Sequence, residues 1–344
     1  MIYFAAFIPG LENLIAGLVR ERLADSKIIK LLDGAVIFET ECTYDRLNFF
    51  CFNNIFAVID IYEAGSNITP ELHIKKINNS KTDKLFMHKV ISENNKQIKS
   101  FRLVCSIENT PAHIDEALKC TIEDFVSRAS GLKVNRSKPD TEFWFLSRRE
   151  GFSCFMKRLT NHRQGEKVLH KGELSPQLAW LLCRFIKLKH GELVADPFCG
   201  YGSIPLAAIK HFPIKFFFAS DIDSQCVKFS NSKTGLKGNE RIEIKKTDFC
   251  LVRDFITRKL DAIVTDPPWG MYKENVSLQK FYDEMLDEFT ELLNENGRAV
   301  ILTAAIKELE SAIERNNAFT IKAKINILVS GKKASIYELT KNHN

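Results

Sequence analysis

The feature that most constrains this chain is a regular alternation of strand and helix signals that begins near residue 192. Because parallel strands need crossover connections, this alternation is typical of a parallel sheet covered by helices. Two final apolar runs split by Ser330-Gly331-Lys332 predict an antiparallel hairpin at the sheet edge. The expected strands are Glu192–Asp196, Ile214–Asp221, Ile242–Asp248, Leu260–Asp266, Ala299–Thr303, Ile321–Val329 and Ala334–Leu339, and the expected helices are Ile204–His211, Ser224–Lys233, Val276–Leu293 and Ile306–Asn316.

The first half of the chain has a different pattern, which predicts a small α+β unit. Apolar spacing predicts helices over Leu11–Leu23 and His113–Ser130, and Gly131 ends the second one. The polar stretch Lys75–Lys99 is expected to be exposed. The expected strands here are Ile2–Ile8, Ala35–Glu39, Phe101–Ile107, Leu132–Val134, Glu142–Leu146 and Phe152–Met156.

Charge and composition narrow the class of protein. Residues 151–190 carry eight Lys and Arg against two Asp and Glu, an excess equal to the net charge of +6 of the whole chain. Such a segment suits either phosphate binding or a solvated linker. No apolar stretch is long enough for a transmembrane helix, and the nine cysteines include no C-x-x-C pair. We therefore expect a cytoplasmic protein without a membrane partner, disulfide framework or metal site.

A glycine turn follows the first strand of the alternating region. The run Asp196-Pro197-Phe198-Cys199-Gly200-Tyr201-Gly202-Ser203 lies between an expected strand and an expected helix. Gly200 and Gly202 would let the backbone approach a ligand closely, beside the free N–H groups of the helix. A tight turn also uses glycine, so the turn alone does not establish a ligand. Pro205 replaces the third glycine of G-x-G-x-x-G, which argues against hydride transfer.

Further acids follow the ends of successive expected strands: Asp221 with Asp223, then Asp248, then Asp266. Ligands of open parallel sheets bind outside the carboxyl ends of the strands, so these carboxylates are expected in one crevice. A carboxylate after the second strand suits the two hydroxyls of a ribose. Each acid by itself also suits a helix cap. Together with the glycine turn, the acids favour a nucleoside-type cofactor.

The second specific motif is Thr265-Asp266-Pro267-Pro268-Trp269-Gly270. The prolines fix the loop, so that Asp266 and the Pro267 carbonyl can form an acceptor pair for an amino group. Hydrogen bonds to both N–H groups of an exocyclic amine would aim its lone pair at an electrophile. Trp269 would stack on the base, which must first leave its own stack. A rigid turn with a core tryptophan is the alternative interpretation.

The order of DPFCGYGSI, SDID, TDF and TDPPWG resembles the class I S-adenosylmethionine (SAM)-dependent methyltransferases that modify exocyclic amines. The first half, with IPGLENL at 8–14 and the run at 113–145, resembles the ferredoxin-like segment plus THUMP domain of RNA guanine-N2 methyltransferases. This resemblance implies an α/β protein with a Rossmann-like methyltransferase domain. It implies a ferredoxin-like segment at 1–60, a THUMP RNA-binding domain at 61–158, a basic linker at 159–173 and the methyltransferase domain at 174–344.

Carried over by position, the resemblance implies that Asp196, Gly200 and Gly202 line the methionine part of SAM. Asp221 would bind the ribose, and Asp248 with Phe249 would contact the adenine. LSPQLAW at 174–180 is similar to a family loop that borders the cofactor. The target base would be held by Asp266, Pro267, Pro268 and Trp269. The implied cofactor-binding set is Ser175, Asp196, Pro197, Phe198, Cys199, Gly200, Gly202, Ser203, Asp221, Ile222, Asp248, Phe249 and Asp266.

The resemblance implies direct transfer of a methyl group from SAM to the N2 amine of a guanosine in structured RNA, with tRNA as the leading class. Many family members have Asn before the two prolines and Tyr or Phe after them. Asp-Pro-Pro-Trp also occurs in adenine-N6 methyltransferases, so methylation of adenine in RNA or DNA stays an alternative. A non-catalytic RNA-binding protein is an alternative of another class. A small activator subunit is compatible with the sequence, and a monomer is expected.

Basic residues near the junction of the two halves are candidates for contacts with RNA phosphates, although solvated surface explains them equally well. They are Arg148, Arg149, Lys157, Arg158, Arg163, Lys167 and Lys171.

Overall fold

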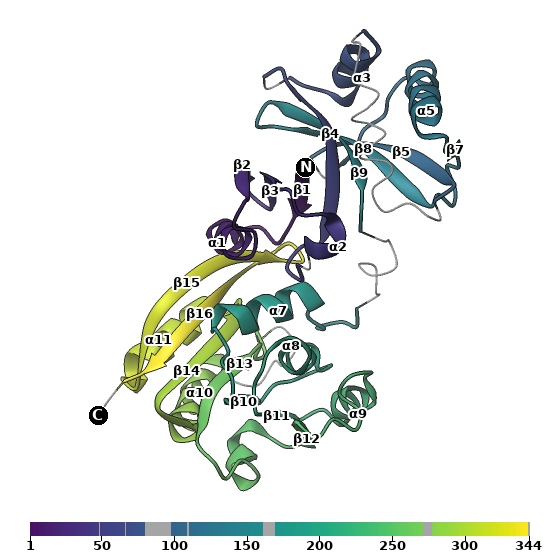
Figure 1. Ribbon diagram of the computed structural model, residues 1–344. Coiled ribbons are helices and arrows are strands. Elements are labelled where there is room, and N and C mark those ends of the chain that lie inside the picture. The colour runs from purple at the N-terminus through teal and green to yellow at the C-terminus, as the bar shows by residue number, and fades with distance from the viewer. Residues whose placement is uncertain are drawn as a thin grey trace. The chain divides into compact units, whose positions relative to one another are not determined.

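A computed structural model describes residues 1–342 except 48, 66, 80–97, 109, 161–168 and 271–276. The chain divides into two compact units (Figure 1). The first contains Met1–Phe7 and Glu12–Lys167, and the second contains Ile8–Leu11 and Val168–Asn344.

The first unit is an α+β unit built on one nine-stranded sheet. The sheet runs β2-β3-β1-β4-β9-β8-β5-β6, with β7 paired to β5. Its pairs are antiparallel except those of β5 with β7 and β8. Its elements are β1 (Ile2–Ala6), α1 (Glu12–Arg22), β2 (Lys27–Leu32), β3 (Ala35–Glu39), α2 (Tyr44–Leu47), β4 (Asn54–Glu63), α3 (Pro70–Asn79), β5 (Ser100–Ile107), β6 (Thr110–Pro111), α5 (Glu116–Ser130), β7 (Lys133–Val134), β8 (Thr141–Arg148) and β9 (Phe152–Arg158).

Local chemistry sets the limits of α5 close to the predicted ones. The carboxylate of Asp115 accepts a hydrogen bond from the N–H of Leu118 and caps the first turn. Gly131 then ends the helix in the left-handed conformation, at φ +73°. The predicted excursion Lys75–Lys99 is wrong over its first residues, because α3 extends to Asn79 and buries Ile77. The rest of that stretch, residues 80–97, lies outside the described residues.

Strand β2 is absent from the sequence-based prediction. Its sequence KIIKLL has two lysines among four apolar residues, and its side chains alternate between exposed and half-buried. It pairs with β3 in an antiparallel hairpin. This edge strand owes its existence to pairing with β3 more than to burial, which a hydrophobic pattern cannot reveal.

The second unit contains the predicted parallel sheet, in the order β12-β11-β10-β13-β14-β16-β15. The first five strands are parallel, and β16 and β15 form the predicted antiparallel hairpin at the edge. Its elements are α7 (Pro176–Phe185), β10 (Leu193–Asp196), α8 (Ser203–His211), β11 (Phe216–Asp221), α9 (Ser224–Ser232), β12 (Ile242–Lys246), the 3-10 helix η1 (Phe249–Asp254), β13 (Leu260–Thr265), α10 (Leu278–Leu292), β14 (Leu293–Thr303), α11 (Ile306–Asn316), β15 (Phe319–Val329) and β16 (Lys332–Lys341).

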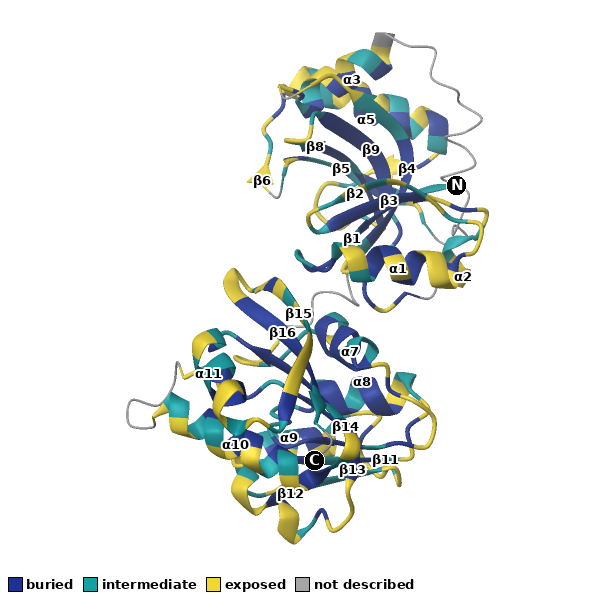
Figure 2. Cartoon of the chain, turned by 90° about the vertical axis from the view of Figure 1, so that its left-hand side faces the viewer, coloured by how far each residue is buried: buried dark blue, intermediate teal, exposed yellow. Residues whose placement is uncertain are grey.

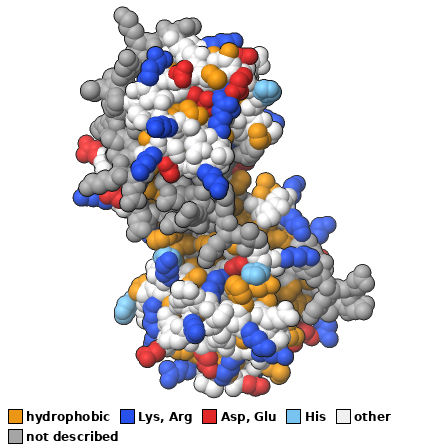
Figure 3. All heavy atoms as spheres, turned by 90° about the vertical axis from the view of Figure 1, so that its right-hand side faces the viewer, with side chains coloured by type: hydrophobic (Ala, Val, Ile, Leu, Met, Phe, Trp, Pro, Cys, Tyr) orange, Lys and Arg blue, Asp and Glu red, His pale blue; other side chains and the backbone are white. Residues whose placement is uncertain are grey.

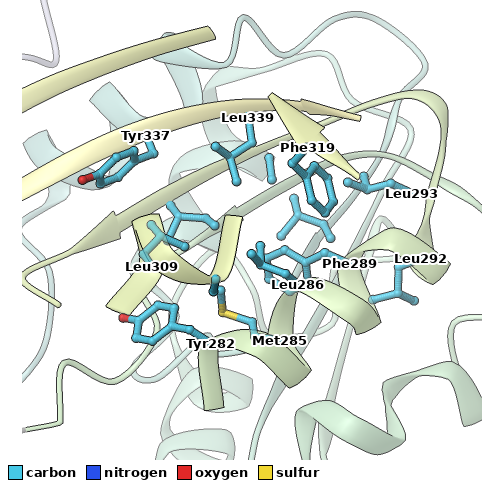
Figure 4. Packing of buried hydrophobic residues seen from close by; sticks show 14 of the residues in the cluster. Tyr282, Met285, Leu286, Phe289, Leu292, Leu293, Leu309, Phe319, Tyr337 and Leu339 are labelled. Carbon is cyan, nitrogen blue, oxygen red and sulfur yellow. The ribbon is translucent and has the colours of Figure 1, made fainter. Parts of the chain in front are cut away.

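Helices cover both faces of this sheet. Helix α7 packs beside α8 on one face, and α10 packs beside α11 on the other (Figure 1). The central strands β10, β13 and β14 are largely buried, whereas the edge strand β15 and the outer sides of the helices carry many exposed residues (Figure 2). Under α10 and α11 lies a dense core that contains Tyr282, Met285, Leu286, Phe289 and Leu339 (Figure 4). This core holds the sheet rigid, so the loops at the carboxyl ends of its strands start from fixed positions.

Candidate active site

Acidic residues meet at the carboxyl edge of the parallel sheet, as the sequence predicts. Strand β10 lies between β11 and β13. The strands β10 and β11 end at Asp196 and Asp221, and β13 ends at Thr265, directly before Asp266. Because these three strands are parallel neighbours, the three carboxylates follow the same edge of the sheet.

Asp196 is buried and only partly bonded. Its Oδ1 accepts hydrogen bonds from the Thr265 hydroxyl at 2.7 Å and from the Phe198 N–H at 3.1 Å. Its Oδ2 is buried and has no hydrogen-bond partner among the described residues. Burial raises the pKa of Asp196 to about 7, although these two hydrogen bonds lower it. The unbonded oxygen is therefore available to a ligand that donates a hydrogen bond or carries positive charge.

The two glycines of the turn serve different purposes. Gly200 has φ +49°, and a Cβ built on it would meet nothing within 4 Å. Gly202 has φ +77°, and its Cβ would lie 2.9 Å from the Ser230 hydroxyl. Gly202 thus lets α9 pack closely behind the turn, whereas Gly200 leaves open space that a ligand can fill.

Asp221 ties the second strand to this turn. Its Oδ2 accepts a hydrogen bond from the Gly200 N–H at 2.9 Å, and its Oδ1 accepts one from the Asp223 N–H at 2.8 Å. Burial raises the pKa of Asp221 against the lowering effect of these backbone bonds. Asp223 instead caps α9 by accepting a hydrogen bond from the Gln225 N–H. The structure separates the two acids: Asp223 is a helix cap, and Asp221 adjoins the turn.

Asp248 and Phe249 begin η1, and Asp248 caps it. The ring of Phe249 lies 5.2 Å from that of Phe198 and 5.1 Å from that of Phe281, and Phe198 and Phe281 are 5.5 Å apart. These three aromatic rings form an apolar cluster that joins the glycine turn to α10. Phe281 was not singled out from the sequence, where it is one of many apolar residues of an amphipathic helix. Ile222, another predicted cofactor residue, is 55% exposed and is free to contact a ligand.

The Asp-Pro-Pro-Trp loop holds its own carboxylate in place. The indole N–H of Trp269 donates a 2.8 Å hydrogen bond to Asp266 Oδ1. Burial raises the pKa of Asp266 to about 8; the Trp269 bond lowers it, and the nearby Asp196 carboxylate raises it further. The Pro267 carbonyl accepts no hydrogen bond from the described part of the chain. Asp266 Oδ2 likewise accepts no hydrogen bond from the described residues, so the acceptor pair expected from the sequence stays a prediction.

The remaining predicted cofactor residues have structural roles as well. Ser175 caps α7 by accepting a hydrogen bond from the Leu178 N–H at 3.2 Å. Cys199 is buried, and burial raises its thiol pKa well above the usual value, which makes it a poor nucleophile. The Pro197 carbonyl accepts a hydrogen bond from the Ser220 hydroxyl at 3.5 Å, and Ser203 opens α8. The sequence predicts no role for Thr265 of the TDPPWG motif, whereas the structure shows that its hydroxyl donates a hydrogen bond to Asp196.

The predicted phosphate-binding residues are not alike. Lys157 is only 1% exposed, so its inclusion was wrong: at an inward-facing position of β9, it cannot reach RNA. Arg148 and Arg158 are also largely covered, and they bind the carboxylates of Glu108 and Glu150 and of Glu142, respectively. Arg149 and Lys171 are exposed, whereas Arg163 and Lys167 lie outside the described residues. On the face shown in Figure 3, Lys and Arg are spread over both units with Asp and Glu among them.

Comparisons with known proteins agree with this geometry. Residues 163–334 match the family model described as "UPF0020: RMKL-like, methyltransferase domain". The tRNA (guanine(10)-N2)-dimethyltransferase of Methanothermobacter thermautotrophicus is 29% identical over 211 residues, which cover 57% of this chain and 60% of that protein. This chain therefore spans less than two thirds of the length of that relative.

Two solved structures have the same fold over nearly the whole chain. TrmN from Thermus thermophilus superposes with a TM-score of 0.78 at 20% identity, over 99% of this chain and 100% of that one. SMU.472 complexed with SAH superposes with a TM-score of 0.69 at 14% identity, over 100% of this chain and 98% of that one. The predicted α/β class with a Rossmann-like methyltransferase fold is confirmed.

Proposed function

This chain belongs to the family of the RMKL-like methyltransferase domain, and on that premise we propose that it methylates the N2 amine of a guanosine in structured RNA, with tRNA as the leading class. The observation that carries the proposal is the hydrogen bond from the Trp269 indole to Asp266 Oδ1, which leaves Asp266 Oδ2 and the Pro267 carbonyl as the proposed acceptor pair. Its position beside Asp196 and Asp221 supports a nucleoside-type cofactor next to the acceptor pair.

The residues present fit SAM as that cofactor. SAM is cationic at its sulfonium and ammonium groups, and the unbonded Oδ2 of Asp196 offers a carboxylate oxygen to such a group. The open space at Gly200 admits a ligand against the turn. Asp221 is placed to accept hydrogen bonds from a ribose, and the ring cluster around Phe249 offers an apolar surface to an adenine. The structural neighbour that contains SAH supports this choice.

When bound, SAM supplies an electrophilic methyl group. The chain's own residues then orient the nucleophile, because an exocyclic amine has a lone pair delocalised into its ring and reacts poorly by itself. Asp266 Oδ2 and the Pro267 carbonyl each accept one N–H of the amine, which directs the lone pair out of the base plane. Trp269 fixes Asp266 through its N–H and offers its ring to the base. Asp266, Pro267, Pro268 and Trp269 form the proposed catalytic loop.

We assign RNA binding to the first unit and to the basic segment that follows it in the sequence. We keep the division into a ferredoxin-like segment at 1–60, a THUMP domain at 61–158, a basic linker at 159–173 and a methyltransferase domain at 174–344 as part of the proposal. The first boundary falls inside β4, so the first two parts share one continuous sheet. Arg149 and Lys171 are the exposed members of the described candidate phosphate contacts.

The proposal also includes a cytoplasmic location and a monomeric state. All nine cysteines are free thiols, which suits a reducing compartment. Among the helices that the structure describes, none is long and apolar enough to cross a bilayer.

Nucleoside mass spectrometry tests the reaction. The full chain is incubated with SAM and unmodified small RNA, and the RNA is digested to nucleosides. We expect new N2-methylguanosine, and N6-methyladenosine would instead support the adenine alternative. With Asp266→Ala we expect no turnover but near-normal SAM binding, because that residue orients the amine and not the cofactor. Full activity of this variant would exclude the assigned role, and a chain that binds RNA but not SAM would support the non-catalytic alternative.

A further inference from the structure

Two residues at the end of α9 donate hydrogen bonds to backbone carbonyls of the glycine turn. The Ser230 hydroxyl donates a 2.8 Å hydrogen bond to the Gly200 carbonyl, and Lys233 Nζ donates a 2.9 Å hydrogen bond to the Tyr201 carbonyl. Ser230 and Lys233 are three residues apart, so they lie on one side of the helix end. Two successive carbonyls of the turn, those of Gly200 and Tyr201, are thus held by the side chains of Ser230 and Lys233.

Lys233 is itself fixed by a residue far away in sequence. Its Nζ lies 2.7 Å from Glu173 Oε1, and the two side chains are only 15% and 9% exposed. Glu173 Oε2 accepts a 3.1 Å hydrogen bond from the His170 N–H, and Oε1 accepts a long one, of 3.5 Å, from the Ser203 hydroxyl. Glu173 therefore joins the segment before α7 to the end of α9 and to the first residue of α8.

Three aromatic rings pack together next to the Lys233–Glu173 ion pair. The His170 ring stacks on that of Tyr201 at 4.5 Å and 11°, and the Phe229 ring meets both edge-on at 4.7 Å and 5.3 Å. The Lys233 ammonium lies 5.6 Å from the centre of the Phe229 ring. His170 and Phe229 thus pack against the Tyr201 ring, while Lys233 donates a hydrogen bond to the Tyr201 carbonyl.

We propose that Lys233 and Glu173 are positioning residues for the cofactor, acting by fixing the orientation of the Tyr201–Gly202 peptide. This inference rests on the proposed use of SAM. Helix α8 begins directly after Gly202, and the first N–H groups of a helix have no partners within it. The orientation of the peptide before them decides where these donors point. A flexible lysine can hold a carbonyl in one place only if its own ammonium is held, and Glu173 does this.

The Lys233–Glu173 ion pair is shielded from water well enough to hold the Lys233 ammonium in place. Exposed pairs contribute little because water and salt screen them, whereas both partners here are mostly removed from solvent. Although burial raises the pKa of Glu173, the hydrogen bonds from Lys233 and from the His170 N–H bring it below its usual value. The carboxylate therefore stays ionised at neutral pH and keeps the lysine in place.

Calorimetric titration of SAM into the full chain tests the inference, with Lys233→Met and Glu173→Gln as the main variants. We expect each variant to weaken SAM binding by about tenfold, within the range known for small displacements of binding groups. The KM for SAM should rise by a similar factor, while kcat at saturating SAM stays within about twofold. Lys233→Arg keeps a charged donor, so it should restore most of the affinity.

A second ion pair in the same unit provides the matched control. Arg298 Nη2 lies 2.9 Å from Glu192 Oε2, and these side chains are 16% and 11% exposed, close to the values for Lys233 and Glu173. Glu192 precedes β10 and so lies at the opposite end of the strand from Asp196. Glu192→Gln should lower the melting temperature about as much as Glu173→Gln but leave the Kd for SAM unchanged.

The outcomes separate the two hypotheses. If the unsubstituted chain binds SAM and both main variants bind it equally well, the positioning role is overturned and the proposed function stands. If Glu192→Gln weakens SAM binding as much as Glu173→Gln, the effect is one of general stability, which also overturns the role. If the unsubstituted chain binds no SAM, the proposed function fails, and this inference fails with it.

Discussion

Replacing Trp269 with phenylalanine removes one hydrogen bond and keeps an aromatic ring. The indole N–H donates to Asp266 Oδ1 at 2.8 Å, and Phe has no donor to replace it. Asp266 would then lose the contact that fixes its carboxylate. A hydrogen bond to a charged group contributes about 1.5–3 kcal/mol, so kcat/KM should fall about 10- to 150-fold.

The same substitution should change the pH dependence in a defined direction. The Trp269 bond favours the ionised form of Asp266 and so lowers its pKa, against the burial that raises it to about 8. Without the bond the pKa rises further, by about one to two units for a contribution of about 1.5–3 kcal/mol. The proposed reaction needs Asp266 as an acceptor, hence ionised. The acidic limb of the kcat/KM profile should therefore move to higher pH.

The assay is transfer of a labelled methyl group to RNA across a pH series, with Trp144→Phe as the control. Trp144 lies in β8 of the first unit, and its indole N–H donates a 2.9 Å hydrogen bond to Glu142 Oε2, so its replacement removes a bond of the same kind without touching Asp266. An unshifted acidic limb in Trp269→Phe, together with a loss no larger than that in the control, would refute the assigned role of the indole N–H. A shift to lower pH would refute the electrostatic reasoning itself.

Four further substitutions test other parts of the second unit. Gly200→Ala should weaken SAM binding because it fills open space at φ +49°, whereas Gly202→Ala should lower the melting temperature because its Cβ would lie 2.9 Å from the Ser230 hydroxyl; calorimetry and thermal unfolding separate these effects. Asp196 has a folded pKa of about 7, above its unfolded value, so the folded state binds more protons and stability falls as pH rises from about 4 to about 7. Asp196→Asn should reduce that slope in denaturant unfolding at several pH values, and Asp266, whose pKa is raised to about 8, should account for part of the slope that stays. Phe289→Ala, in the fully buried core of Figure 4, should cost about 3–5 kcal/mol of unfolding free energy in denaturant titrations.

Most elements of the second unit could be predicted because their signals are local. The expected limits of α11 agree with the structure residue by residue, and those of α8 and β13 agree within one residue. Parallel strands buried on both faces must be apolar throughout, and their acids and glycines mark the ends. The TDPPWG loop could likewise be placed, since its prolines restrict the backbone whatever surrounds it.

Contacts between distant segments could not be predicted in this way. Lys157 looked like an available cation in a basic stretch, yet its place on an inward face of β9 buries it. Strand β2 is at most half-buried although four of its six residues are apolar, and it pairs with β3 at the sheet edge. Asp223 and Asp221 look equivalent in the sequence, and only the fold makes one a helix cap and the other a partner of the glycine turn.

The sequence by itself determined the order of strands and α-helices from β10 onward, the edge at which the carboxylates meet and the residues of the Asp-Pro-Pro-Trp loop, but it did not predict α7, where 174–180 was expected to be a loop. These properties follow from periodicity and from backbone restrictions that act over a few residues. Only the tertiary structure decided that Thr265 holds Asp196, that Phe281 joins the aromatic cluster and that Glu173 fixes Lys233 behind the turn. Glu173 and Lys233 are sixty residues apart, and no short-range pattern records a pair that packing alone brings together.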